Sequence, residues 1–540
     1  MPQQNTVELE IVGTTHDGRG VARLDGLAVF VPYALEGERV RAELLQKGGR
    51  YAVARVTELL ASSPARIEPD CPVYGECGGC GFRHMTYAEE LRVKRARVAD
   101  ALRRIGGLAV EVPPVLGADS MVRNKATLPF GVLGGRVTTG FYAGGSRRLV
   151  PHPAGCALYP PVFRVLADAA CSYAQAHGLR AGERGVLRRI SLRLAETTGE
   201  VSAALYCAPG AQVSLAGLAR ALQAAAPETV CVCAVPEPDG PPRFFTPRRE
   251  IEDMLCQNRL RISPLSFYQV NRRQAERLYE TAAAMAGLSV RQNRTYAGDA
   301  VFDLCCGIGS ITLFLARLCG RVYGAEINPH AIENARINAG LNNIRNVSWK
   351  CGDAAAALRD WTDAGVRPRL VCVDPPRAGL DGPLRAALLR TAPPQILYIS
   401  CDPATLARDC RALCGDGYAL AGVQPVDMFA RTAHVETVAV LSRKSATRTF
   451  IPVTVSPKDM GLDEAKAQPT YENIRKYVKE THGLTVSTLN IAQMKAECGL
   501  EMECDRSGGK QQPKCPPEKR EAILDAFRHF GMIEDDSSEG

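Results

Sequence analysis

The run from Val301 to Glu326 constrains the fold more than any other part of this 540-residue chain. Val301-Phe302-Asp303-Leu304 has the composition of a buried strand, and it leads into a loop with two glycines and a helical pattern over 311–318. A second apolar run ends in Glu326, 23 residues after Asp303. This order of strand, glycine loop, helix, strand and acid predicts half of a Rossmann-like sheet, with ligands at the carboxyl ends of the strands.

The loop over 303–309 indicates which nucleotide such a sheet would hold. It has two glycines but no complete G-x-G-x-x-G fingerprint. Three acids, Glu326, Asp353 and Asp374, follow successive predicted strands, and Glu326 is placed to bind both ribose hydroxyls. This pattern favours S-adenosylmethionine over NAD. The alternative, a dinucleotide-dependent dehydrogenase, lacks its fingerprint and leaves Cys401 unexplained.

Cys401 stands at the end of a predicted strand, in the stretch Tyr398-Ile399-Ser400-Cys401-Asp402-Pro403. A later strand carries His434 and Glu436. A thiol and a carboxylate on the same sheet as a nucleotide loop suggest covalent catalysis on a substrate that needs nucleophilic activation. From the residues alone, the base is Glu436 or His434 with equal weight. The structural alternatives are a buried core cysteine and a strand-edge acid.

Residues 1–60 contain several short strand patterns separated by glycine turns, which predict a small OB-like β-barrel. Basic and aromatic side chains on this segment could follow a phosphate backbone. They are Arg19, Arg23, Arg41, Lys47, Arg50 and Tyr51. The alternative is a barrel that serves only as a spacer with a solvated basic face.

Four cysteines form a candidate metal site. Cys71, Cys77 and Cys80 lie within ten residues among glycines and a proline, and Cys156 lies in a second Gly- and Pro-containing loop. Four thiolates can hold tetrahedral zinc or a [4Fe–4S] cluster, and spacing does not decide between them. Buried thiols are the alternative. His84 is better explained as a packing or surface residue.

The remaining organisation follows from length and composition. We expect a central α/β domain over 61–260, a nucleotide-binding domain over 261–445, a linker over 446–468 and a helical module over 469–540 with a disordered tail. The module is expected to be a helix-turn-helix-like binding unit or a small acidic docking domain. Its Cys498, Cys504 and Cys515 match no trusted metal spacing.

The charge distribution and the cysteine content indicate which partner the chain binds and in which cellular compartment it works. Residues 1–445 carry 53 Lys and Arg against 42 Asp and Glu, whereas residues 446–540 carry 13 against 16. The modest basic excess fits a polyanion partner. The polar start, the lack of a membrane-length apolar run and the 20 cysteines predict a cytoplasmic, reducing environment and no membrane partner.

Taken together, residues 1–445 resemble the RNA uracil-C5 methyltransferases of the RumA/TrmA family, and most of all the bacterial members that act on 23S rRNA and carry a TRAM domain and an iron–sulfur cluster. The resemblance rests on six motifs in the same order. They are the x5, x2 cysteine spacing with Cys156, Phe267-Tyr268-Gln269-Val270-Asn271, the loop 303–309, Asp374-Pro375-Pro376-Arg377, Ser400-Cys401-Asp402-Pro403 and His434-Val435-Glu436.

The resemblance implies roles for individual residues. Cys401 would add to carbon 6 of uracil, and Glu436 would remove the carbon-5 proton. The expected S-adenosylmethionine contacts are Gln269, Cys305, Ser310, Glu326, Asp353 and Asp374. Cys305 stands where the family commonly has an aromatic residue, and Ser310 where it often has Asn. The expected [4Fe–4S] ligands, with zinc as the alternative, are Cys71, Cys77, Cys80 and Cys156.

The resemblance implies RNA as the partner, most of all ribosomal RNA, with the target uridine flipped out of its stack. We expect a monomer. Rival functions are a tRNA uridine-54 methyltransferase, a cytosine-C5 RNA methyltransferase and a radical methylthiotransferase. Against these, Ser400 stands where the cytosine enzymes usually have Pro, and the cysteine spacing is not C-x3-C-x2-C. A catalytically idle RNA-binding protein on this fold would have no need of Cys401 and Glu436.

Overall fold

The computed structural model divides into two compact units, residues 1–452 and 453–540, which we describe separately. Within them it describes residues 6–15, 17–151, 155–211, 215–238, 240–288, 296–444, 471–498, 515–530 and 532–533. The expected linker over 446–468 and the expected disordered tail lie outside the described residues. No helix among those described is long and apolar enough to cross a membrane.

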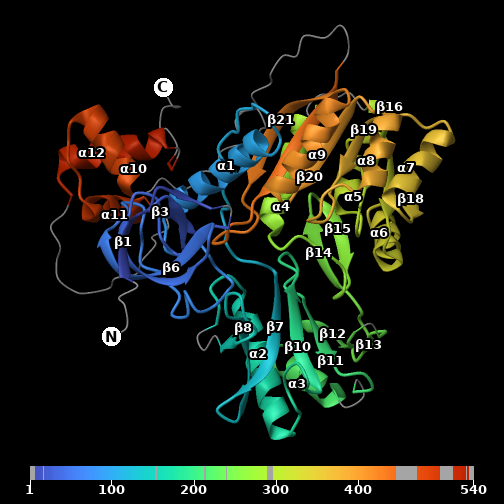
Figure 1. The fold of residues 1–540 in the computed structure, drawn as a ribbon, viewed down its shortest axis with the longest axis horizontal. Coiled ribbons are helices and arrows are strands. Elements are labelled where there is room, and N and C mark those ends of the chain that lie inside the picture. Colours follow the sequence, from blue (N-terminus) through green and yellow to red (C-terminus); the bar gives the residue numbers. More distant parts are fainter. Residues whose placement is uncertain are drawn as a thin grey trace. The chain divides into compact units, whose positions relative to one another are not determined.

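The first unit begins with a six-stranded sheet in the order β1-β5-β6-β4-β3-β2. Its strands are β1 Thr6–Glu10, β2 Gly13–Thr14, β3 Gly20–Leu24, β4 Leu27–Val31, β5 Arg39–Lys47 and β6 Tyr51–Ala61 (Figure 1). Their alternating side chains enclose a small apolar core that includes Leu9, Ala22, Val29 and Val40. The small β-structure predicted at this end of the chain is therefore present.

A loop rich in cysteine leads from β6 to the helix α1, Tyr87–Arg104. Thr86 caps α1 by accepting a hydrogen bond from the backbone N–H of Glu89, as Thr commonly does at a helix start. Val98 and Leu102 on α1 belong to the apolar core of the third sheet described below. This helix therefore joins the N-terminal part of the chain to the domain that carries Cys401.

The central sheet has seven strands in the order β13-β12-β11-β10-β7-β8-β9. Its core is shared with the helices α2 and α3, which contribute residues such as Leu166 and Leu218 (Figure 1). The elements are β7 Lys125–Leu133, β8 Arg136–Tyr142, β9 Leu149–Pro151, α2 Pro161–Ala176, β10 Leu187–Leu194, β11 Val201–Cys207, α3 Ala216–Ala225, β12 Thr229–Pro236 and β13 Arg243–Phe244.

The third sheet also has seven strands, in the order β18-β17-β16-β19-β20-β22-β21. The strands β16 to β20 pair in parallel, whereas β22 pairs antiparallel to both β20 and β21. A hairpin, β14 Ile251–Leu255 and β15 Asn258–Ile262, precedes this sheet. The strands are β16 Tyr296–Leu304, β17 Cys319–Glu326, β18 Val347–Cys351, β19 Pro368–Val373, β20 Gln395–Ser400, β21 Tyr418–Val426 and β22 Glu436–Arg443.

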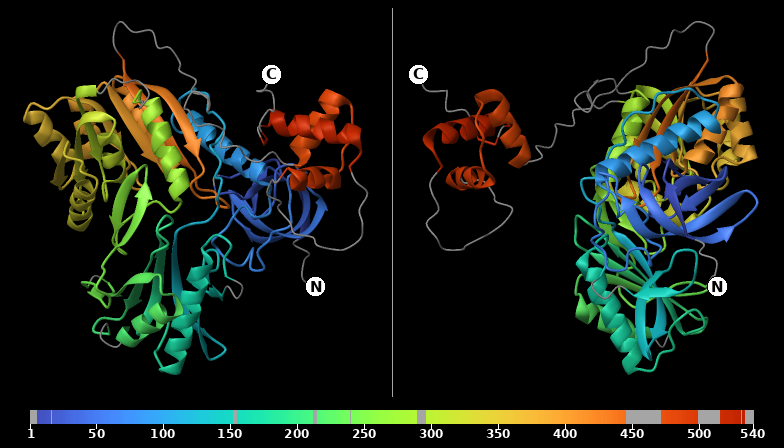
Figure 2. Two further views of the ribbon diagram at one scale, coloured as in Figure 1. Left: turned by 180° about the vertical axis from the view of Figure 1, so that it is seen from behind. Right: turned by 60° about the vertical axis from the view of Figure 1, so that its left-hand side comes forward.

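Helices cover both faces of this sheet (Figures 1 and 2). One face packs against α4, α5 and α6, and the other against α1, α7, α8 and α9. The bounds are α4 Arg272–Met285, α5 Ser310–Ala316, α6 Pro329–Leu341, α7 Ala354–Asp363, α8 Gly382–Thr391 and α9 Pro403–Gly415. The Rossmann-like order predicted for 301–326 is confirmed, because β16, α5 and β17 follow one another and β16 pairs with β17 in parallel.

The second unit contains three described helices, α10 Tyr471–His482, α11 Thr488–Glu497 and α12 Pro517–His529. They enclose a separate apolar core that includes Ile474, Ile491, Ile523 and Phe527. These helices agree with the helical character expected of this segment from the sequence. Of the three cysteines noted there, Cys498 and Cys515 are described and Cys504 is not.

Candidate active site

Cys401 and Glu436 meet at the edge where β20 ends and β22 begins. The antiparallel register pairs Ile399 with Val438 and Ser400 with Thr437. Cys401 directly follows the last residue of β20 and Glu436 is the first residue of β22, so the two residues lie at the same end of this strand pair. The charge of Glu436 acts on the Cys401 thiol. Tertiary structure therefore brings together the thiol and the carboxylate, 35 residues apart in sequence.

The pKa values of Cys401 and Glu436 are both shifted upward, chiefly by burial. Burial, together with the charges of Glu436 and Asp374, raises the pKa of Cys401 to about 11. Burial, and then the charge of Asp374, raises the pKa of Glu436 to about 8. The guanidinium of Arg377 opposes both shifts. Groups with strongly perturbed pKa values often cluster at catalytic sites, so this pair is a candidate nucleophile and base.

His434, the other candidate base, has different properties. Burial and the positive charges of Arg377, Arg97 and Arg123 lower its pKa to about 4. Its ring lies edge-on to Phe429, with centroids 5.9 Å apart. At neutral pH this imidazole is uncharged and a much weaker base than ionised Glu436. The pKa values therefore favour Glu436 over His434 as the proton acceptor.

The glycine loop forms an open cradle at the end of β16. Gly307 has a φ of +56°, and a Cβ placed on it would meet no atom within 4 Å. Gly309 has a φ of +84°, and a Cβ there would come within 2.8 Å of the Trp349 ring. Cys305 also adopts a left-handed φ of +72°. The loop thus exposes its backbone to a ligand on one side and packs tightly on the other.

Acidic groups surround this cradle. Glu326 accepts hydrogen bonds from the backbone N–H of Gly307 at 3.0 Å and of Asn328 at 2.9 Å. Asp303 is fully buried beneath the loop, its Oδ1 has no hydrogen-bond partner, and burial raises its pKa to about 7. Burial and Asp303 together raise the pKa of Asp374 to about 7 as well. An orphaned buried oxygen beside an open backbone is suited to a polar or cationic ligand.

The other expected cofactor contacts lie around the same strand ends. Ser310 begins α5 and its hydroxyl is 3.0 Å from that of Tyr279. Asp353 begins α7, where its Oδ1 accepts from the backbone N–H of Ala356 at 2.8 Å. Gln269 is buried, and its carbonyl accepts from the side chain of Asn124 at 3.0 Å. Asp353 therefore caps a helix in addition to any ligand contact.

The four cysteines predicted as metal ligands line a single cavity of about 70 Å³. Arg83 and Arg123 line the same cavity, and Arg83 hydrogen-bonds Cys80. Among the described residues, no three His, Cys, Asp or Glu side chains are grouped so as to hold a metal ion. His84 lies outside this lining. It is buried against Tyr74 and Tyr33, which agrees with the expected packing role.

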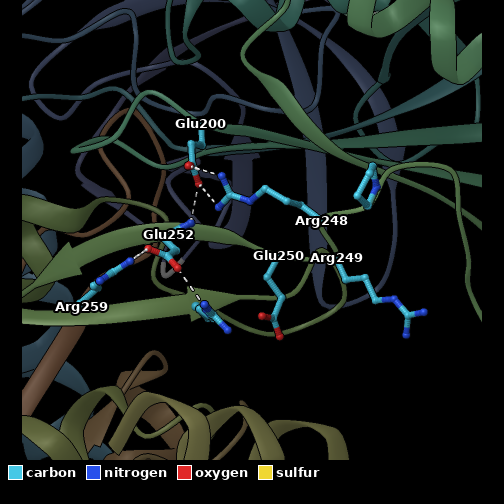
Figure 3. A pocket seen from close by; sticks show the side chains of 8 residues that line it. Glu200, Arg248, Arg249, Glu250, Glu252 and Arg259 are labelled. Carbon is cyan, nitrogen blue, oxygen red and sulfur yellow. Dashed lines mark hydrogen bonds and ion pairs between the residues drawn. The ribbon is translucent and has the colours of Figure 1, made fainter. Parts of the chain in front are cut away.

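A second, wider pocket of about 550 Å³ lies between the central sheet and the β14–β15 hairpin (Figure 3). Most of its charges neutralise one another. Arg248 binds both carboxylate oxygens of Glu200, and Glu252 pairs with Arg259 and Arg261. This arrangement is typical of a structural ion network, and we assign the pocket no catalytic role.

Several residues of the site could not be recognised from sequence. Arg377 is exposed and acts electrostatically on Cys401, Glu436 and His434. Its position in Asp374-Pro375-Pro376-Arg377 was the only available signal. In the sequence, Asp303 marks only the start of the glycine loop. Asp427 begins the segment that leads to Glu436, and its partners on α1 are 333 and 340 residues away.

Comparisons with known proteins agree with this geometry. A family model for tRNA (uracil-5-)-methyltransferases matches residues 257–444, and one for the TRAM domain matches residues 4–57. An uncharacterized RNA methyltransferase of Halalkalibacterium halodurans is 37% identical over 82% of this chain and 98% of its own length. One from Listeria innocua is 36% identical over 82% of this chain and 99% of its own length.

The structure is also similar to that of a Pyrococcus abyssi tRNA (uracil-54, C5)-methyltransferase in complex with S-adenosyl-L-homocysteine. The TM-score is 0.61 and the identity 26%, over 80% of this chain and 99% of that chain. Fold and site thus define an S-adenosylmethionine-dependent RNA methyltransferase with a TRAM domain. More narrowly, the chain belongs to the RNA uracil-C5 methyltransferase family.

Proposed function

We propose that this protein methylates carbon 5 of a uridine in RNA through a covalent adduct between Cys401 and carbon 6 of the base. The observation that supports the proposal is the position of Cys401 and Glu436 at the same end of the β20–β22 pair, where the charges of Glu436 and Asp374 both act on the Cys401 thiol. Carbon 5 of uracil is a weak nucleophile. A group that adds to carbon 6 turns the ring into an enolate that can attack a methyl donor.

The two side chains divide the chemistry. The Cys401 thiolate forms a bond to carbon 6, and the electron pair of the ring double bond moves toward the carbonyl oxygen. S-adenosylmethionine supplies the methyl group that carbon 5 then accepts. Glu436, when ionised, takes the proton from carbon 5, and the electrons of that bond restore the double bond and release the thiolate. The positive charge of Arg377 favours both anionic forms.

We assign the cofactor to the cradle at the ends of β16 to β19. The open backbone at Gly307 and the orphaned Oδ1 of Asp303 support this assignment, because a ligand with a cationic amino group would satisfy that oxygen. The residues proposed to contact S-adenosylmethionine are Gln269, Cys305, Ser310, Glu326, Asp353 and Asp374.

We propose 23S rRNA as the substrate and tRNA uridine 54 as the second candidate. The second is favoured by the Pyrococcus abyssi neighbour, whose own substrate is that position. We propose residues 1–60 as the TRAM barrel, 61–260 as the cysteine-bearing domain and 261–445 as the methyltransferase domain. Mapping of 5-methyluridine in rRNA and tRNA from a deletion strain separates the two substrates, since only the true target loses its modification.

We propose that the four cysteines hold a [4Fe–4S] cluster. Tetrahedral zinc with bonds of about 2.3 Å would bring its four sulfurs to roughly 3.8 Å from one another. The four thiols line a cavity of about 70 Å³ together with Arg83 and Arg123, whose positive charges would offset the negative charge of a cluster. Methyl transfer needs no electron, so the cluster would be structural or would position RNA. Anaerobically purified protein should contain about four iron and four sulfide per chain, and stoichiometric zinc would contradict the cluster.

The mechanism is tested by Cys401→Ala, with Cys171→Ala as the control at a partly buried thiol on α2. We expect Cys401→Ala to abolish methyl transfer to RNA and to leave S-adenosylmethionine binding near normal. We expect Glu436→Gln to accumulate a protein–RNA adduct that survives denaturation, because elimination stalls. Normal turnover of Cys401→Ala would refute the mechanism.

A further inference from the structure

The segment that delivers Glu436 is the 427–435 loop, which joins β21 to β22. Glu436 is the first residue of β22, so the position of its carboxylate depends on how this loop is held. The loop begins at Asp427, whose side chain is fully buried. A buried carboxylate needs compensating charge or hydrogen bonds, and here the partners come from α1, a helix of the N-terminal half of the chain.

Asp427 is the centre of a buried ion network. Its Oδ1 accepts from Lys94 Nζ at 2.6 Å, and its Oδ2 accepts from the Tyr87 hydroxyl at 2.7 Å. Lys94 Nζ also donates to Glu90 Oε1 at 2.7 Å and to the carbonyl of Phe429 at 3.2 Å. The side chains of Glu90, Lys94 and Asp427 are all 0% exposed.

Arg431 holds the middle of the loop against the same network. Its backbone N–H donates to Glu90 Oε1 at 2.7 Å, and its φ is +67°, which is rare for a residue with a side chain. Its carbonyl accepts from the N–H groups of Gly81 at 2.9 Å and Phe82 at 3.1 Å. A backbone conformation of this kind persists only where the surroundings over-determine it, and functional loops are where such strain collects.

The remaining backbone of the loop is tied down at both ends. The carbonyl of Asp427 accepts from Gln274 Nε2 at 3.0 Å, and that of Ala430 accepts from Arg123 at 3.2 Å. Near Glu436, the carbonyl of Ala433 accepts from Arg97 of α1. Fixed contacts from α1, α4 and the cysteine-bearing part therefore reach the loop along its whole length.

Stability alone is a poor explanation for this network. A buried ion pair gains little net stability over well-packed apolar residues, because both charges lose their hydration. Such a network does fix one geometry, since its charges have low-energy partners in only one arrangement. We propose that Glu90, Lys94 and Asp427 are positioning residues that aim Glu436 at carbon 5 of the bound uridine. This inference rests on the proposed function.

The proposal predicts which chemical step fails. Cys401 follows β20, which the network does not touch, so formation of the adduct should survive loss of the network. Removal of the carbon-5 proton by Glu436 should slow, because proton transfer requires hydrogen-bond distance. A positioning defect therefore leaves the enzyme covalently attached to methylated RNA, whereas general destabilisation would lower all steps together.

The test compares Lys94→Met and Asp427→Asn with Glu436→Gln as the reference. For both network variants we expect turnover to fall at least tenfold, the KM for S-adenosylmethionine to stay within twofold, and the denaturation-resistant RNA adduct to accumulate. Tyr87→Phe removes one hydrogen bond to Asp427 and the acceptor of the Ala118 N–H, but it leaves the Lys94–Asp427 ion pair, so it should give a smaller increase in adduct. If Lys94→Met and Asp427→Asn do not fold, the amount of adduct in Tyr87→Phe tests the proposal.

Arg66→Met is the matched control. Arg66 pairs with the buried Glu38 near the barrel and has no contact with the 427–435 loop, so its loss should not increase the adduct. Normal turnover in the network variants, or lost turnover without added adduct, would overturn the inference while Glu436→Gln still traps RNA. If Glu436→Gln itself traps none, the proposed base is wrong and the inference falls with it.

Discussion

At the scale of single residues, the site is defined by a thiol and a carboxyl group whose pKa values are both raised. Cys401 has a pKa raised to about 11 and Glu436 one raised to about 8, so near neutrality both are mainly protonated in the free protein. Each gains reactivity as pH rises. Methyl transfer is therefore expected to accelerate from pH 7 toward 9, as ionised Glu436 becomes the major form.

The coupling between these two groups can be measured directly. Removal of the Glu436 charge by Glu436→Gln should lower the pKa of Cys401, because that charge is the second cause of its rise after burial. The rate of iodoacetamide alkylation of Cys401, followed by mass spectrometry, should then reach its midpoint at lower pH. Cys171 is an internal control, since burial raises its pKa to about 11 without Glu436. An unchanged Cys401 profile would show that the groups do not interact.

At the scale of elements, the strand ends and helix starts place the chemistry. Asp402 caps α9, where its Oδ1 accepts from the N–H groups of Ala404 at 2.9 Å and Thr405 at 3.0 Å. It directly follows Cys401, so this cap also fixes the chain beside the thiol. The neighbouring helix α8 begins in the same manner, with Asp381 accepting from Leu384 N–H at 2.7 Å and proline in its first turn.

These two caps form a matched pair. Asp402→Ala and Asp381→Ala should each cost about 1 kcal/mol of unfolding free energy, as lost caps do, measured by chemical denaturation. Only Asp402→Ala should also lower the rate of methyl transfer, because only that cap adjoins the nucleophile. Equal rates in the two variants would show that the geometry at Cys401 does not depend on its cap.

At the scale of the whole molecule, the chain separates into a unit that carries the candidate active site and a small helical unit. The apolar core of the helical unit contains only its own residues, such as Ile474 and Phe527. The family models match residues no later than 444. Among the described residues, the helical unit therefore has an apolar core of its own.

A chain that ends at Pro452 tests this separation. We expect it to unfold at the same denaturant concentration as the corresponding transition of the full protein and to methylate RNA at a rate within about twofold. The full-length protein is the control in both measurements. A tenfold loss of rate with unchanged stability would instead assign the helical unit a part in substrate binding.

The sequence by itself determined the local parts of this protein. The glycine loop, the acid at the end of β17 and the three helices of the second unit follow from spacing and periodicity, which neighbouring residues dictate. The short strands of residues 1–60 likewise follow from residues close together in the chain. The resemblance added the family, which the comparisons confirm, whereas the individual site roles stay predictions.

Only the tertiary structure decided what lies around those parts. The pairing of β20 with β22 brings Cys401 and Glu436 to the same end of the sheet, and burial together with the charges of Asp374 and Arg377 shifts their pKa values. The contact of Lys94 with Asp427 joins residues 333 apart, and no local pattern encodes it. Long-range pairing and desolvation depend on which surfaces meet when the chain folds, so they are properties of the assembled sheet and its helices.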